Sequence, residues 1–111
     1  MEFDEYQTKT KETAIYPRDN PIMALSYATL GLAGEAGEIA NKVKKIIRDN
    51  KGELTQEVKD KLSAELGDVL WYISALATEL DASLNDVADK NIQKLFSRKE
   101  RGVLQGSGDN R

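Results

Sequence analysis

A chain of 111 residues is long enough for one domain, which would bury about 65% of its unfolded surface. Hydrophobic residues make up 40% and the net charge is −3, so the chain is too apolar for disorder and lacks the basic block of a protein that binds a nucleic-acid polymer. Cysteine is absent, and neither a signal-peptide pattern nor an apolar run of roughly 20 residues is present. We therefore expect a soluble, cytoplasmic protein without a disulfide framework or a membrane partner.

The first half of the chain predicts two helices. Residues 4–14 carry a weak apolar stripe, and this helix should stop before Pro17 because the residue preceding a proline disfavours the helical conformation. Asn20 is a good N-cap and Pro21 suits the first position of a helix. The apolar pattern that follows continues to the polar turn at residues 49–52.

The second half predicts two more helices, which begin after the N-cap candidates Thr55 and Ser83. Because no period-two alternation of any length occurs, the fold class is all-α with four helices. We expect one domain over residues 1–111, with a core over about 20–101 and a loop-like tail over 102–111.

The segment Val69–Leu76 (Val-Leu-Trp-Tyr-Ile-Ser-Ala-Leu) is apolar almost all the way round. Such a helix must be covered on more than one side, which a single four-helix chain can hardly achieve. We therefore predict a four-helix bundle completed by self-association, as a homodimer or homotetramer. The alternative is a long monomeric bundle that encloses this helix.

Two pairs of acids are spaced i, i+3 within apolar stretches: Glu35 with Glu38, and Glu65 with Asp68. On a helix this spacing places both side chains of a pair on one face. Four acids that meet across two helices would repel one another unless a cation lay between them. With no histidine or cysteine in the chain, an all-oxygen site suits Mg²⁺ first and Mn²⁺ next. The alternative is two solvated acidic helix faces.

Three glycines recur at every third residue of the predicted second helix: Gly31, Gly34 and Gly37. Each costs roughly 1 kcal/mol relative to alanine in a helix interior. Either another helix or a ligand approaches closely along this face, or the helix bends before the first acidic pair. Gly67, between the acids of the second pair, poses the same question.

Aromatic residues accompany the second acidic pair. Tyr72 lies within about 20° of Glu65 around the helix, because each residue advances by about 100°. Tyr72 and Trp71 could therefore stack on a nucleobase, although packing in a core or interface is the competing interpretation.

A polar ridge is predicted on the fourth helix, where Asn91, Lys94 and Arg98 follow spacings of three and four. Such a ridge could neutralise phosphates, and a solvated basic face is the alternative. If the ridge does not hold phosphates, this role would fall to Lys42 or Lys45, or to the tail that ends in Arg111.

Four motifs follow one another along the chain: Gly-Leu-Ala-Gly-Glu-Ala-Gly-Glu (31–38), Glu-Leu-Gly-Asp-Val-Leu-Trp (65–71), Asn-x-x-Lys-Leu-x-x-Arg (91–98) and Gly-Ser-Gly-Asp-Asn-Arg (106–111). In this order they resemble the short, single-domain branch of the MazG-like, all-α nucleoside triphosphate pyrophosphohydrolases. The resemblance covers residues 20–111. One position departs from the pattern: many members carry a further acid immediately before the first pair, where this chain has Gly34.

The resemblance implies a Mg²⁺-dependent enzyme that cleaves a nucleoside triphosphate between the α and β phosphates, giving a monophosphate and pyrophosphate in nucleotide-pool sanitation or regulation. Glu35, Glu38, Glu65 and Asp68 would hold the metal, with Glu38 as the candidate general base. Charge neutralisation and positioning, which such acids and their metal supply, are what this class of reaction needs most.

Two other functions are compatible with the same residues: a nucleotide sensor without catalysis and a helical interaction protein. The absence of histidine argues against a carboxylate-bridged di-iron bundle, which usually carries a Glu-x-x-His motif.

Overall fold

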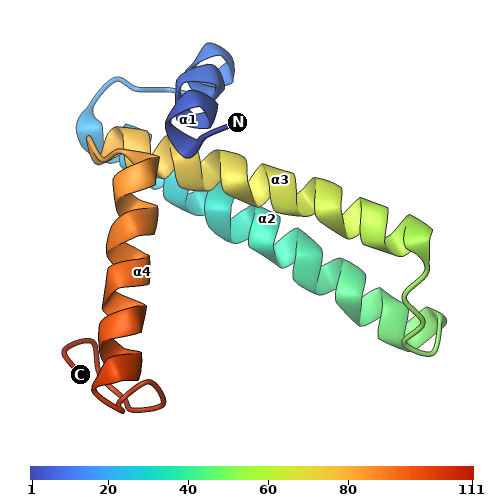
Figure 1. The fold of residues 1–111 in the computed structure, drawn as a ribbon. Coiled ribbons are helices and arrows are strands. Elements are labelled where there is room, and N and C mark those ends of the chain that lie inside the picture. Colours follow the sequence, from blue (N-terminus) through green and yellow to red (C-terminus); the bar gives the residue numbers. More distant parts are fainter.

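The computed structural model describes residues 1–111, and it confirms the all-α prediction (Figure 1). The elements in chain order are α1 (Phe3–Thr10), the 3₁₀ helix η1 (Lys11–Thr13), α2 (Pro21–Asp49), α3 (Gln56–Glu79) and α4 (Leu84–Glu100).

The three long helices begin where the sequence predicts. Asn20 caps α2, because its side-chain oxygen accepts a hydrogen bond from the backbone N–H of Met23 at 2.8 Å. Thr55 and Ser83 cap α3 and α4 in the same way, each at 3.2 Å. These side chains satisfy backbone donors that a helix start leaves without partners.

Helices α2 and α3 lie side by side as a long hairpin, which is the main body of the molecule (Figure 1). Helix α1 packs across the end of this hairpin that is remote from the α2–α3 turn, where it contacts α3 and α4. Helix α4 starts at that end and projects away from the hairpin, giving an angular molecule of 44 × 42 × 28 Å.

Gln7 ties α1 to the turn between α3 and α4. Its side-chain amide donates to the carbonyl oxygen of Ala82 at 2.9 Å and to the hydroxyl of Thr78 at 3.1 Å. Its carbonyl oxygen accepts from the backbone N–H of Leu84 at 2.8 Å. Because Gln7 is buried and each of its polar atoms is satisfied, it fixes the N-terminal helix on the hairpin.

The buried core is formed by small residues around one tyrosine. Ala24 and Ala28 of α2 and Ala75 of α3 are buried, and Tyr16 packs with them. The Tyr16 hydroxyl donates a hydrogen bond to the carboxylate of Glu79. Burial, followed by this contact with Glu79, raises the pKa of Tyr16 to about 12. The tyrosine therefore anchors the segment before α2 to the C-terminal end of α3.

Only 11 of the 111 residues are buried, so a single chain leaves much apolar surface uncovered. Within the predicted central segment, Ser74 and Ala75 are buried whereas Ile73 remains exposed. On α4, Ile92 and Phe96 are 48% and 59% exposed. Self-association therefore remains a prediction, and these exposed apolar residues are the ones that a second copy would cover. None of the helices combines the length and the apolar character that a membrane span requires.

Candidate metal centre

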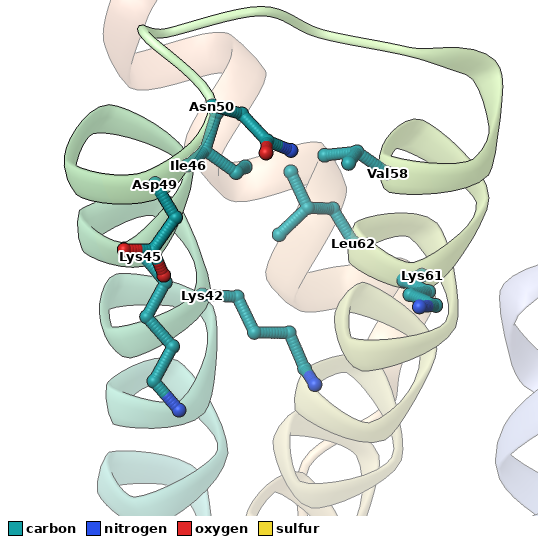
Figure 2. Close-up of a pocket in the computed structure, with 8 residues that line it drawn as sticks. All are labelled: Lys42, Lys45, Ile46, Asp49, Asn50, Val58, Lys61 and Leu62. Atoms are coloured by element: carbon teal, nitrogen blue, oxygen red, sulfur yellow. The ribbon is translucent and has the colours of Figure 1, made fainter.

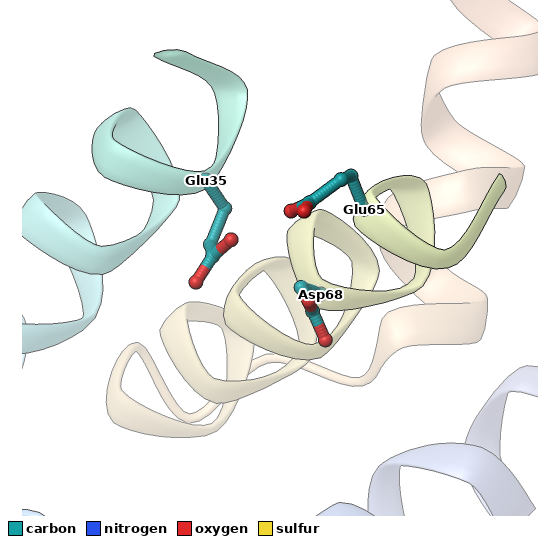
Figure 3. A group of neighbouring side chains, drawn as sticks. All are labelled: Glu35, Glu65 and Asp68. Atoms are coloured by element: carbon teal, nitrogen blue, oxygen red, sulfur yellow. The ribbon is translucent and has the colours of Figure 1, made fainter. Parts of the chain in front are cut away.

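Three of the four predicted acids meet between the two helices of the hairpin (Figure 3). Glu35 points from α2 toward Glu65 and Asp68 on α3, and one carboxylate oxygen of each lies within 4.8 Å of the others. Glu35 and Glu65 are partly buried, while Asp68 is exposed. The cluster is therefore open to solvent on one side, as a site that binds a ligand must be.

The charges of these acids are poorly compensated by the protein. Partial burial, and then the charges of Asp68 and Glu65, raise the pKa of Glu35 above its ordinary value. The nearest cation is Lys42, whose ammonium nitrogen lies 3.6 Å from a carboxylate oxygen of Glu65. A divalent cation would relieve this repulsion, and an all-carboxylate set is the donor chemistry that Mg²⁺ and Mn²⁺ prefer. The residues present thus fit the predicted metal.

Glu38, the fourth predicted ligand and the candidate base, lies outside this cluster. It is exposed on α2, one turn beyond Glu35, and its charge also contributes to the raised pKa of Glu35. Its roles as ligand and base remain predictions.

A pocket of about 350 Å³ adjoins the acids and is lined by five residues, Thr13, Glu35, Asp68, Trp71 and Tyr72. The Trp71 and Tyr72 rings meet edge to face, with centroids 5.0 Å apart. Sequence reasoning identified both aromatic residues but missed Thr13, whose hydroxyl accepts a hydrogen bond from the indole N–H of Trp71 at 2.9 Å. No sequence signal indicated Thr13, because it comes from a polar segment 58 residues away.

The glycines of α2 have different surroundings. A side chain at Gly31 would overlap the ring of Tyr72, so close approach explains this glycine. Gly34, Gly37 and, on α3, Gly67 have nothing within 4 Å of the place of a Cβ atom. Because α2 is one continuous helix, a break before the acidic pair does not explain Gly34 and Gly37, and a bend there remains a prediction.

The predicted phosphate-binding ridge lies on α4, and none of its members lines the pocket beside the acids. Asn91 and Lys94 are exposed. Arg98 is buried and donates a hydrogen bond to the carbonyl oxygen of Asp109 at 3.1 Å, which ties the C-terminal tail to α4. Phosphate binding by these residues remains a prediction.

Nearer the hairpin turn, a second pocket of about 280 Å³ is lined by Lys42, Lys45 and Lys61 and by apolar residues that include Ile46 and Leu62 (Figure 2). Two of these lysines are already paired with acids: Lys42 with Glu65 at 3.6 Å, and Lys61 with Glu57 at 3.1 Å. This pocket adjoins the acid cluster through Lys42.

Comparison with known proteins identifies the family of the chain. The family of the MazG nucleotide pyrophosphohydrolase domain matches residues 25–103, and the chain belongs to this family. The chain is 59% identical to the Gene 37 protein of Mycobacterium phage L5 over the whole of both chains. It is 32% identical to the uncharacterized protein YpjD of Bacillus subtilis (strain 168), over 69% of each chain. No solved structure matches the chain.

Proposed function

We propose that this protein is a Mg²⁺-dependent nucleoside triphosphate pyrophosphohydrolase, which converts a ribo- or deoxyribonucleoside triphosphate and water into the monophosphate and pyrophosphate. One observation carries the proposal: Glu35, Glu65 and Asp68 converge from two helices beside a pocket lined by two aromatic rings. Membership of the MazG nucleotide pyrophosphohydrolase family points to the same class of reaction.

Glu35, Glu65 and Asp68 would hold the metal, with Glu38 as a further ligand or as the base that accepts a proton from the attacking water. Bound Mg²⁺, for which Mn²⁺ could substitute, supplies positive charge for the polyphosphate and makes water more acidic. Partial burial of Glu35 and Glu65 keeps their carboxylates in place between the helices. Asp68 and Glu38 are exposed and Glu35 lines the pocket, so substrate and water would reach these three acids.

The nucleobase would occupy the pocket beside the acids and stack on Trp71 or Tyr72. For the phosphates, Asn91, Lys94 and Arg98 are the predicted contacts, and they would have to come from a second copy because those of the same chain do not line this pocket. We therefore propose a homodimer or homotetramer, which the exposed apolar residues of α3 and α4 support. A cytoplasmic role in nucleotide-pool sanitation or regulation would suit such a substrate.

A pyrophosphate-release screen across canonical and modified nucleoside triphosphates tests the proposal. At least one substrate should yield pyrophosphate and the monophosphate with Mg²⁺ or Mn²⁺, and a chelator should abolish the release. Nucleotide binding without turnover would identify a sensor instead. No binding at all would leave a helical interaction protein, whose acids are surface residues.

A further inference from the structure

The segment that joins α1 to α2 reaches the pocket beside the acids through Thr13 of η1. The Thr13 hydroxyl accepts a hydrogen bond from the Trp71 indole N–H at 2.9 Å and donates one to the carbonyl oxygen of Thr10 at 3.1 Å. Because an indole N–H can only donate, Thr13 accepts the bond from Trp71, and its own hydroxyl proton goes to Thr10.

Thr10, which receives that second hydrogen bond, is itself immobilised on α3. It is buried, and its hydroxyl bonds to the carbonyl oxygen of Gln7 at 2.7 Å and lies 2.9 Å from the hydroxyl of Ser74. Ser74 is fully buried. Thr13 is therefore the exposed end of a chain of hydrogen bonds that starts inside the protein, although it contributes nothing to the core itself.

Tyr16 holds Trp71 from another side. The Tyr16 and Trp71 rings meet edge to face with centroids 6.3 Å apart. Tyr16 is in turn stacked on Tyr27, and its hydroxyl donates a hydrogen bond to the Glu79 carboxylate. Packing against Tyr16 locates the Trp71 ring, but a ring contact alone does not select the orientation of an indole about its χ angles. The hydrogen bond that the indole N–H donates to the Thr13 hydroxyl supplies that selection.

We propose that Thr13 is a positioning residue of the nucleotide site. Its hydrogen bond fixes the Trp71 indole in the orientation in which a nucleobase stacks beside Tyr72 while the triphosphate reaches Glu35 and Asp68. The inference rests on the proposed function, since it assigns the pocket to the base. It makes the N-terminal segment, remote in sequence from every acidic motif, a wall of the substrate site.

Trp71 is the single tryptophan of the chain, so its indole resonance and fluorescence report on this site alone. The test compares wild type with Thr13→Val, which keeps the shape and removes the hydroxyl, and with Thr13→Ser, which restores the hydroxyl. Thr29→Val is the matched control, because the Thr29 hydroxyl bonds only within α2, to the carbonyl oxygen of Leu25 at 2.8 Å. Far-UV circular dichroism and Tm would verify that each variant is folded.

In Thr13→Val the indole N–H resonance should shift and its hydrogen exchange should accelerate, while Thr13→Ser and Thr29→Val should match wild type. For the best substrate of the pyrophosphate screen, KM should rise about three- to tenfold in Thr13→Val, the net effect of losing one neutral hydrogen bond. The kcat value should stay within about twofold, because the acids are untouched.

Two outcomes would overturn the inference, and they differ. An unchanged indole resonance or unchanged KM in Thr13→Val, with wild type active, would refute the role of Thr13 and leave the proposed function intact. Absence of pyrophosphate release by wild type in the screen, together with no response of Trp71 fluorescence to nucleoside triphosphates with or without Mg²⁺, would refute both.

Discussion

The two halves of the α2–α3 hairpin differ in how completely the chain covers them. In the half next to α1, Ala24, Ala28 and Ala75 are buried and Tyr16 closes the core. In the half next to the turn, Ile46 is the one buried residue of the two helices. The acid cluster lies between these halves. The half next to α1 therefore forms one wall of the candidate site within the chain, and the half next to the turn leaves the other side open.

This difference indicates which parts of the site should be intact in a single chain. The closed half orients Trp71 and Tyr72 through contacts with Thr13, Tyr16 and Gly31. The open half presents the exposed Glu38. It also presents Gly34, Gly37 and Gly67, which have nothing within 4 Å of the place of a Cβ atom, so a second copy could complete this side.

Removing one carboxylate from the acid cluster between the two halves should have the largest effect on activity. Asp68→Asn should lower turnover by at least about 100-fold, because loss of even an outer-shell partner of a metal site costs 10- to 100-fold. Asp60→Asn, an exposed acid two turns earlier on α3, is the control and should retain wild-type rates. Steady-state kinetics with Mg²⁺ measure both. Near-normal rates in Asp68→Asn would make the acid cluster structural.

A charge on the uncovered face of α4 should disrupt self-association. Phe96 is 59% exposed, and Phe96→Asp should weaken the oligomer by at least about 30-fold if this ring is desolvated at the subunit contact. Gln93→Asp, a neighbouring exposed position on α4, should have little effect. Sedimentation velocity at micromolar concentrations measures both. A monomeric wild type would contradict the prediction of a homodimer or homotetramer.

Two glycine substitutions compare the halves directly. Gly37→Ala should stabilise the protein by up to about 1 kcal/mol, because alanine favours the helix and nothing lies near the added methyl group. Gly31→Ala should lose that gain and destabilise by about 1 kcal/mol or more, since the Tyr72 ring must move. Chemical denaturation gives both values. The reverse order would contradict the structure of the Gly31–Tyr72 contact.

The smallest effect concerns the metal-free acids. Because the pKa of Glu35 is raised above its ordinary value of 4.5, the folded chain holds this proton more tightly than the unfolded chain does. The free energy of unfolding therefore falls as the pH rises from 4.5 through the raised pKa, because Glu35 ionises less readily in the folded chain. Well below pH 4.5, Glu35 is protonated in both states and this loss is absent. In chelator, Glu35→Gln should melt slightly higher than wild type at pH 7, with no difference at about pH 3.5. A lower Tm at pH 7 would show that ionised Glu35 is stabilising.

The fold could be predicted largely from local signals. Asn20, Thr55 and Ser83 carry side chains that satisfy the first N–H groups of a helix, so they predict the starts of α2, α3 and α4 from nearby residues alone. The meeting of Glu35 with Glu65 and Asp68 was also predictable, because each acid lies at helical spacing in an apolar stretch.

The remaining features depend on contacts between distant segments. Thr13 has no periodic or capping signal, and it joins the pocket because the segment after α1 folds over α3. The direction of α4 is set by the turn near Ala82 and its bond to Gln7, so the sequence did not indicate that Lys94 lies apart from the acids of its own chain. Both depend on tertiary packing rather than on local preference.

The most direct test of the proposed function is a ³¹P NMR time course of one hydrolysable nucleoside triphosphate with Mg²⁺. With wild-type protein, resonances of pyrophosphate and the monophosphate should grow together, stop when chelator is added, and be nearly absent with Asp68→Asn. Formation of orthophosphate with a diphosphate, or turnover that continues in chelator, would contradict metal-dependent cleavage between the α and β phosphates.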